Sequence, residues 1–280
     1  MTASSSDYSK LSSADGTMLR HPDRPVPRYR PLRAVRSFQA LIKDKEDTSL
    51  VFKIFESLPS RDFMDRVSEL SLSERGEYLR ATEMCLAEIL DDHAALRRTP
   101  KNSLAHAYCD FMEAEGLSAA GLVAEAERLG RPKYPDLVQW FAERSRDTHD
   151  LFHVLTGYGR DALGEQCVLL FTHGQSPSQG HLLIGYAGAA NIKKMIKGSN
   201  APVFGAVRQA HRTGKGAPSL MAQSIRELLA QPIDDVRAKL RIPQPTKYFE
   251  CHRIWQEEGI DPYDLLSTKP AEQELMAAKA

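Results

Sequence analysis

The chain has 280 residues, which is enough for one large or two small domains with a sizeable hydrophobic core. Lysine and arginine together number 37, as do aspartate and glutamate, so the net charge is zero and gives no support to nucleic acid as a partner. Four dispersed cysteines, without CxxC spacing, argue against a zinc ribbon and against a disulfide framework.

Residues 1–30 are rich in serine and then in proline, and we expect them to form a disordered N-terminal arm. This segment contains Asp7, Asp15 and Asp23, with no arginine before Arg20, whereas a mitochondrial presequence is rich in arginine and poor in acidic residues. We therefore expect a bacterial cytoplasmic protein. No apolar run approaches the roughly 20 residues that span a bilayer, so we expect no integral membrane segment.

From Leu32 onward, apolar residues recur at spacings of three and four, and this pattern predicts an all-α protein. The helix predicted over 74–96 has the clearest apolar stripe, and Ser71 with Glu74 is its expected capping box. We expect a single multi-helix domain over 31–245 and a C-terminal extension over 246–280. The predicted helices cover residues 32–43, 47–58, 74–96, 102–114, 117–129, 134–155, 161–173, 179–197, 201–213, 217–230 and 232–240.

The helix predicted over 134–155 contains the run His149-Asp150-Leu-Phe-His153. Residues four apart lie one turn above each other on the same helix face, so both imidazoles can bind one metal ion. Asp150 points about 100° away, where it either binds the ion from the side or accepts an imidazole N–H. The run is not the HExxH of a metalloprotease, because position 150 is Asp, and the chain lacks the Glu-x-x-His pairs of di-iron bundles.

Gly157-Tyr-Gly159 follows this run and predicts a turn that ends the helix. Asp161 is the expected N-cap of the next helix, so Glu165 falls in about its first turn. We predict a hairpin of two antiparallel helices that brings Glu165 back toward the two histidines.

Two arginines precede the run on the same predicted helix. Their side chains either belong to a solvated face or bind a substrate carboxylate through two hydrogen bonds. We favour Arg146 over Arg144 for substrate binding, because Arg146 lies seven residues before His153 and seven positions return to nearly the same helix face.

The segment His181–Ala190 is rich in small residues and is followed by Lys193, Lys194 and Lys197. One interpretation is a close-packed core helix with a solvated basic end. The other is a groove for a long apolar chain, or a surface that faces a membrane, because small side chains leave space beside a helix.

A family resemblance is carried by Arg146-Asp-Thr-His149-Asp150-Leu-Phe-His153-Val-Leu-Thr-Gly157 and its continuation Ala162-Leu-Gly-Glu165. This stretch resembles the signature of the coenzyme Q (ubiquinone) biosynthesis protein 4 family, in a bacterial-type member, with its HDxxH(x11)E pattern intact. The resemblance covers residues 30–245, including Arg30-Pro-Leu-Arg-Ala-Val and Pro232-Ile-Asp-Asp-Val-Arg-Ala-Lys-Leu.

The resemblance implies ubiquinone biosynthesis on a polyprenylated benzoate ring, together with other biosynthesis proteins as partners. We therefore predict a metal-dependent lyase that replaces the C1 carboxyl of a 4-hydroxybenzoate-derived ring by hydroxyl. His149, Asp150, His153 and Glu165 are the predicted metal ligands and catalytic residues, and Arg146 is the predicted substrate-binding residue. Zinc is the ion that we expect by ligand type, and ferrous iron is the alternative.

Two other classes of protein stay open. One is a non-catalytic, prenyl-lipid-binding scaffold that organises a ubiquinone synthesis complex. The other is a metal-dependent phosphohydrolase with His93, His106 and Asp234 as further ligands, although no sequence context supports these residues. For an enzyme or a scaffold we expect peripheral attachment to the inner face of the cell membrane, or to the matrix side of the mitochondrial inner membrane in a eukaryote. A homodimer is compatible with either class.

Overall fold

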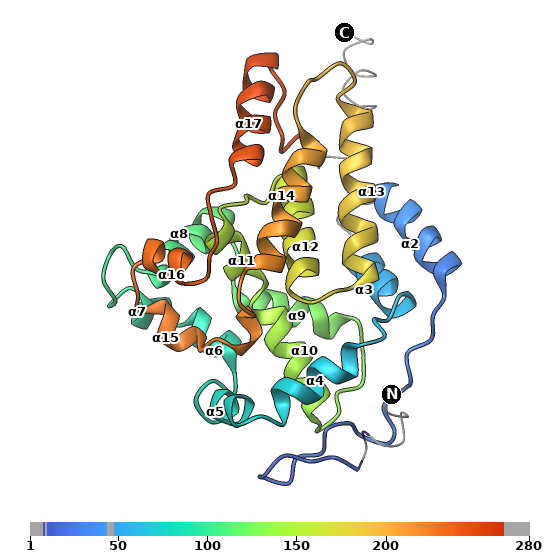
Figure 1. Ribbon diagram of the computed structural model, residues 1–280, viewed down its shortest axis with the longest axis vertical. Coiled ribbons are helices and arrows are strands. Elements are labelled where there is room, and N and C mark those ends of the chain that lie inside the picture. The colour runs from blue at the N-terminus through green and yellow to red at the C-terminus, as the bar shows by residue number, and fades with distance from the viewer. Residues whose placement is uncertain (1–7, 9, 44–47, 266–280) are drawn as a thin grey trace. The chain divides into compact units, whose positions relative to one another are not determined.

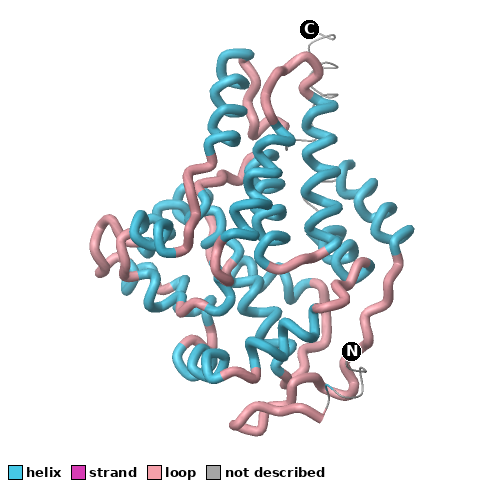
Figure 2. The backbone as a smooth tube through the Cα atoms, viewed as in Figure 1, coloured by secondary structure: helices cyan, strands magenta, loops and turns pink. Residues whose placement is uncertain are grey.

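A computed structural model describes residue 8 and residues 10–43 and 48–265. Within these residues the chain forms helices and connecting loops and contains no strand, only isolated bridges between Ser12 and Met18 and between Ser103 and Pro232 (Figure 2). The prediction of an all-α fold is confirmed. The remaining parts of the expected N-terminal arm and C-terminal extension, at residues 1–7, 9 and 266–280, lie outside the described residues.

The chain divides into two compact units. Unit 1 comprises Met1–Val26, Ser60–Leu155 and Ala217–Ile242, and unit 2 comprises Pro27–Pro59, Thr156–Gly216 and Pro243–Ala280. Unit 1 contains α4 (Phe63–Ser71), α5 (Glu74–Thr82), α6 (Leu86–Asp91), α7 (His93–Leu96), α8 (Leu104–Glu115), α9 (Ala119–Arg128), α10 (Leu137–Asp147), α11 (His149–Thr156, whose last residue falls in unit 2), the 3-10 turn η1 (Leu220–Ala222), α15 (Ile225–Leu229) and α16 (Ile233–Lys239). Unit 2 contains α2 (Pro31–Lys43), α3 (Thr48–Ser57), α12 (Ala162–Gln175), α13 (Gln179–Met195), α14 (Val203–Gly216) and α17 (Thr246–Glu258).

The core of unit 1 forms around the apolar side of α10. Asp136 caps this helix by accepting the Gln139 N–H at 2.8 Å, and Arg24 pairs with the same carboxylate at 2.7 Å. The main-chain amide of Leu137 donates to the Met18 carbonyl at 3.0 Å. This part of the expected disordered arm therefore packs on α10 instead of extending away from it. The core side chains are Leu19, Val67, Leu79, Leu137, Val138, Trp140 and Phe141.

The prediction of one continuous helix over 74–96 is wrong, because the structure divides this stretch into α5, α6 and α7. The first break follows from Glu83, which leaves the helical conformation at φ −139° and whose buried carboxylate pairs with Arg144. The second break is at Asp92, whose side chain caps α7 by accepting the Ala95 N–H at 2.9 Å. Ser73, and not Ser71, caps α5.

Two further helices were missed. The sequence pattern did not predict α4 or α17, and the helix predicted over 217–230 is reduced to η1 and α15. The other predicted helices are present, and most of them begin and end within about two residues of the predicted positions. The helix predicted over 134–155 is interrupted at Thr148, between α10 and α11.

In unit 2, α12, α13 and α14 run side by side (Figure 1). The glycines of α13 allow close packing: a Cβ atom at Gly185 would lie 1.5 Å from Leu170 Cδ2, and one at Gly180 would lie 2.4 Å from Phe55 Cδ1. These positions support the interpretation of the His181–Ala190 segment as a close-packed core helix. The α2 helix packs on α3 through Ala34, Leu41 and Ile54.

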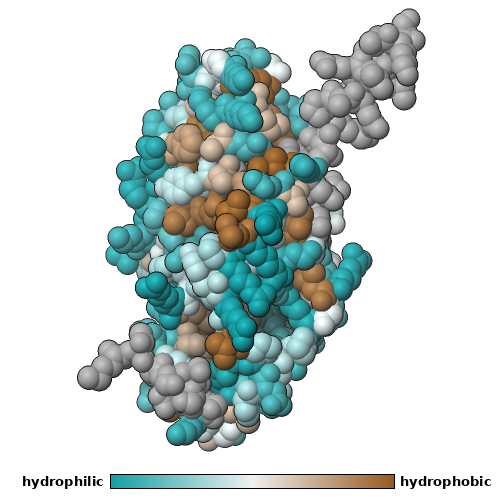
Figure 3. Space-filling view, turned by 90° about the vertical axis from the view of Figure 1, so that its right-hand side faces the viewer, coloured by the Kyte–Doolittle hydropathy of each residue, from teal (hydrophilic) through white to brown (hydrophobic). Residues whose placement is uncertain are grey.

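The outer face of α2 carries exposed apolar side chains. Leu32 is 74% exposed and Val35 is 46% exposed, and both lie among arginines. Figure 3 views the molecule from the side on which α2 lies in Figure 1, and hydrophobic groups there are interspersed with hydrophilic ones. None of the helices within the described residues is both long and apolar enough to cross a membrane.

Candidate metal centre

The two histidines of the HDxxH run lie on α11, one turn apart, as predicted. Their ring centroids are 5.2 Å apart and the ring planes are nearly perpendicular, at 80°. His153 is buried, whereas His149 is partly exposed. The structure thus brings together the first two predicted ligands on one face of α11, within unit 1.

The His153 ring is held by an aromatic neighbour. Phe111 on α8 stacks on it with a centroid distance of 5.6 Å and an interplanar angle of 19°. Asp150 is 9% exposed, and its charge acts on the buried Tyr108, also on α8. Burial raises the pKa of the Tyr108 phenol and the negative charge of Asp150 adds to this shift. The α8 helix therefore contacts His153 through Phe111.

The C-terminal end of α11 is fixed by Arg237, which sequence reasoning missed. Its guanidinium donates to the carbonyl of Leu155 through Nε and to that of Val154 through Nη2, both at 3.0 Å. A cation at this end of a helix satisfies carbonyls that lack partners within the helix and interacts favourably with the helix dipole. Arg237 lies in the last turn of α16, within the Pro232–Leu240 segment that carries part of the family resemblance.

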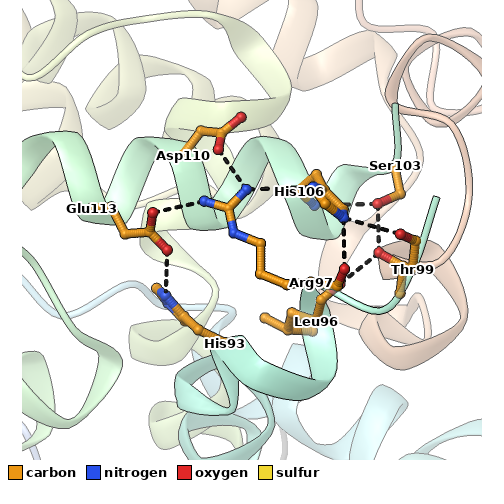
Figure 4. A network of polar contacts seen from close by, with 8 residues as sticks. All are labelled: His93, Leu96, Arg97, Thr99, Ser103, His106, Asp110 and Glu113. Atoms are coloured by element: carbon orange, nitrogen blue, oxygen red, sulfur yellow. Dashed lines mark hydrogen bonds and ion pairs between the residues drawn. The ribbon is translucent and has the colours of Figure 1, made fainter. Parts of the chain in front are cut away.

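A polar network joins α7 to α8 (Figure 4). The Arg97 guanidinium donates to Asp110 at 2.6 Å and to Glu113 at 2.8 Å, and His93 Nδ1 lies 3.2 Å from Glu113. His106 Nε2 lies 3.0 Å from the carbonyls of both Arg97 and Thr99. His93 and His106 therefore have structural partners, and the network supports the helix that carries Phe111.

His93, Cys109 and Glu113 form a second group of ligand-type side chains, with candidate atoms within 4.8 Å of one another. Arg97 already neutralises Glu113, and its hydrogen bond holds the pKa of this carboxyl below its ordinary value. Burial raises the pKa of the Cys109 thiol and so favours the form that does not bind metals. The Arg97 network accounts for this group without an ion.

The two arginines before the motif have different environments. Arg144 is buried, pairs with Glu83 at 2.9 Å and donates from Nε to the Met221 carbonyl at 2.9 Å, so it is a structural residue. Arg146 donates to Asp147 at 2.7 Å, and 17% of its side chain is exposed. Its predicted role in binding a substrate carboxylate stays a prediction.

The turn that leads to Glu165 belongs to unit 2 and forms as predicted. Gly157 adopts φ +74°, a conformation that favours glycine, and α11 ends at Thr156. Asp161 caps α12 by accepting the N–H groups of Leu163 at 3.0 Å and Gly164 at 3.2 Å. Burial opposes ionisation of Asp161, but the nearby His252 ring and the hydrogen bond from Tyr248 outweigh it and hold the pKa of this carboxyl below its ordinary value.

Glu165 lies in the first turn of α12, where it is 28% exposed and 3.7 Å from Arg160. The convergence of Glu165 on the two histidines of unit 1 stays a prediction. The donors of α11 suit a metal: two imidazoles one turn apart, with the Asp150 carboxylate next to His149 in the sequence, are ligand types that zinc and ferrous iron both accept. His173, further along α12, places Nδ1 2.8 Å from the Ser178 carbonyl oxygen and 3.0 Å from the Ser178 nitrogen, and it lies beside His211 of α14, with ring centroids 5.0 Å apart.

These features define an all-α protein with a candidate metal centre on α11. The sequence profile of the family described as coenzyme Q (ubiquinone) biosynthesis protein Coq4 matches residues 67–246. Because this match spans more than half of the chain, the protein belongs to that family, and the resemblance seen in the sequence is confirmed.

Two curated relatives come from fungi. The chain is 27% identical over 154 residues to the mitochondrial ubiquinone biosynthesis protein COQ4 of Arthroderma otae, covering 54% of this chain and 53% of that protein. It is 25% identical over 167 residues to the mitochondrial ubiquinone biosynthesis protein coq4 of Penicillium rubens, covering 58% and 55%. The chain thus spans about half the length of the curated relatives that it matches.

One solved structure shares the fold. The crystal structure of a Nostoc punctiforme protein described as a candidate for ubiquinone biosynthesis matches with a TM-score of 0.52. It covers 77% of this chain and 100% of its own chain at 18% identity. At this identity the similarity establishes a common fold and nothing about activity.

Proposed function

We propose that this protein acts in ubiquinone biosynthesis as a metal-dependent enzyme that replaces the C1 carboxyl of a polyprenylated 4-hydroxybenzoate-derived ring by hydroxyl. The observation that carries the proposal is the paired imidazoles of His149 and His153 on α11, inside the region that matches the Coq4 family. Together with Asp150 and Glu165 they would hold one divalent ion. Zinc is the expected ion and ferrous iron is the alternative.

A bound divalent ion would supply Lewis acidity, which orients a substrate carboxylate or phenolate and stabilises negative charge as bonds break. In the reaction the bond from C1 to the carboxyl carbon breaks, carbon dioxide leaves, and a bond from C1 to oxygen forms. If water supplies the oxygen, dioxygen accepts the two electrons and becomes hydrogen peroxide. If dioxygen supplies it, a two-electron donor reduces the second oxygen atom to water.

The residues of the chain would contribute position and charge to this chemistry. Phe111 holds the His153 ring, and Arg237 fixes the end of α11, so the imidazoles are oriented before substrate arrives. Arg146 would bind a carboxylate of the substrate through its guanidinium. A ring with a long prenyl tail also suits peripheral attachment to a membrane, for which the exposed Lys194 and Lys197 at the end of α13 supply positive charge.

The location and the partners belong to the same proposal. Both fungal relatives are named as mitochondrial proteins, and we propose a peripheral location on the membrane in which ubiquinone is made. The expected partners are the polyprenylated ring, the membrane surface and other ubiquinone biosynthesis proteins.

Substitution of Glu165 by Gln tests the enzyme against the scaffold. The variant keeps the shape of the side chain but weakens its binding to a metal ion, and cells that carry only this variant should accumulate a prenylated ring that still bears its carboxyl. Glu250→Gln is the control, because it makes the same change at an exposed ion pair with Lys247 in unit 2 and should leave ubiquinone at its normal level. Normal ubiquinone in the Glu165 variant, with loss of metal confirmed by elemental analysis, would support a non-catalytic prenyl-lipid-binding scaffold instead.

A further inference from the structure

A buried polar cluster in unit 2 joins α17 to the start of α12. The side chain of Asp161 is completely buried, and its Oδ1 accepts the two main-chain amides that begin α12. Its Oδ2 accepts the hydroxyl of Tyr248, and His252 Nε2 lies 3.3 Å from the same oxygen. Both carboxylate oxygens are therefore occupied, one by α12 and the other by α17.

The Tyr248 hydroxyl also fixes the turn that precedes α12. It accepts the main-chain N–H of Gly159 at 3.0 Å while it donates to Asp161. The backbone passes so close that a Cβ atom at Gly159 would lie 2.9 Å from this hydroxyl, and one at Gly164 would lie 2.0 Å from the Gly159 carbonyl oxygen. One hydroxyl on α17 thus determines the path of the chain from Gly159 to the first turn of α12.

Glu165 lies in that first turn, and its main-chain N–H donates to the Asp161 carbonyl at 3.0 Å. The main-chain position from which the Glu165 carboxylate extends is therefore set by the turn that Tyr248 holds. A metal ligand must lie within about 0.5 Å of the position that binding requires, and loss of a group that orients a ligand typically weakens metal binding about 10- to 100-fold.

We propose that Tyr248 of α17 is a positioning residue for the metal ligand Glu165. The proposal rests on the proposed function, since Glu165 has this role only if it binds the ion. Tyr248 and His252 lie just beyond residues 67–246, the part of the chain that matches the Coq4 family, so the family match does not include them.

The experiment measures the zinc affinity of the full chain by competition with a chromophoric chelator. Tyr248→Phe keeps the aromatic ring and removes only the hydroxyl, so we expect zinc to bind about 10- to 100-fold more weakly. Tyr8→Phe is the matched control, because Tyr8 is also buried and its hydroxyl donates to a carboxylate, Asp65, at 2.5 Å in unit 1. The control should keep the affinity of the unsubstituted chain.

A second variant covers the case in which Tyr248→Phe does not fold. Gly159→Ala leaves Tyr248 in place but forces the turn and the hydroxyl apart, so zinc should again bind more weakly. Circular dichroism under the assay conditions establishes that each variant is folded.

The outcomes separate the two proposals. If the unsubstituted chain binds zinc, and the folded Tyr248→Phe and Gly159→Ala variants bind it as tightly, the positioning role is wrong while the metal site stands. If the unsubstituted chain binds neither zinc nor ferrous iron, the metal site of the proposed function is wrong, and the positioning role is wrong with it.

Discussion

Breaking the buried ion pair between Glu83 and Arg144 should strongly destabilise unit 1. Their side chains are 0% and 1% exposed, and Glu83 Oε2 lies 2.9 Å from Arg144 Nη1. Glu83 Oε1 accepts the Ser224 hydroxyl at 2.5 Å and the Arg226 main-chain N–H at 3.0 Å. Burial lowers the pKa of Arg144 in spite of this partner, which indicates how strongly the cation is removed from water.

Substitution of Glu83 by Gln removes the compensating charge without changing the size of the side chain. The buried cation then keeps only neutral hydrogen-bond partners. Whichever way the new amide is oriented, its NH2 group faces N–H or O–H donors that the carboxylate oxygen accepted. Breaking a buried ion pair by removing one partner costs about 3 to 5 kcal/mol, so we expect the free energy of unfolding of unit 1 to fall by about that amount. Restoring the carboxylate by Asp would not suffice, because its side chain is one methylene shorter.

Urea unfolding followed by tryptophan fluorescence measures this loss. Of the two tryptophans, Trp140 lies in unit 1 and Trp255 in unit 2, so a Trp255→Phe background reports on unit 1 alone. Glu127→Gln, at the exposed ion pair with Lys133, is the control and should leave the free energy of unfolding almost unchanged. A loss in the Glu83 variant no larger than that in the control would refute the argument.

Three further predictions concern the metal, the membrane and acid. Elemental analysis should find about one divalent ion per chain. The His153→Ala variant should lose this ion, whereas the His93→Ala control should keep it. Unchanged metal content in the His153 variant would exclude His153 as a ligand. The chain should float with anionic liposomes at moderate salt, and a variant with Lys194 and Lys197 replaced by Gln should float less well. Failure of the unsubstituted chain to float at any salt concentration or lipid composition would exclude direct membrane binding. Burial, followed by the charge of a neighbouring histidine, lowers the pKa of His211 in the folded protein. The unfolded state therefore binds more protons than the folded state as the pH falls below about 6.5, and unit 2 should lose stability on acidification. Urea unfolding of His211→Gln, followed by Trp255 fluorescence at several pH values, should show a weaker dependence on pH, and an equal dependence would contradict the assignment.

Local signals in the sequence predicted the parts of the site that depend on helix periodicity and turn chemistry. The spacing of His149 and His153 placed both rings on one face of α11, and Asp161 was correctly identified as the N-cap of α12. The split of residues 74–96 could not be predicted in this way, because Glu83 leaves the helix for partners more than 60 residues away in sequence. The same holds for Phe111, Arg237 and Tyr248, whose roles come from contacts between distant segments.

Composition alone could not decide between a close-packed core helix and a groove or membrane-facing surface for the glycine-rich α13 helix. Small residues indicate that there is space beside a helix, but they do not indicate what fills it. In the structure Leu170 and Phe55 fill it at Gly185 and Gly180. Exposed apolar side chains occur on both helices, at Leu182 and Met195 of α13 and at Leu32 and Val35 of α2.

The link between Asp161 and α17 bears on how this protein should be divided for expression. A fragment whose ends follow the family match would stop at residue 246 and omit Tyr248 and His252. Asp161 would then lose both groups that approach one of its carboxylate oxygens, and the turn before α12 would lose the hydrogen bond between the Gly159 N–H and the Tyr248 hydroxyl. For this chain the limits set by sequence similarity are therefore not the limits of the folding unit, and a fragment must extend through α17, which ends at Glu258, to keep these contacts of the α12 cap.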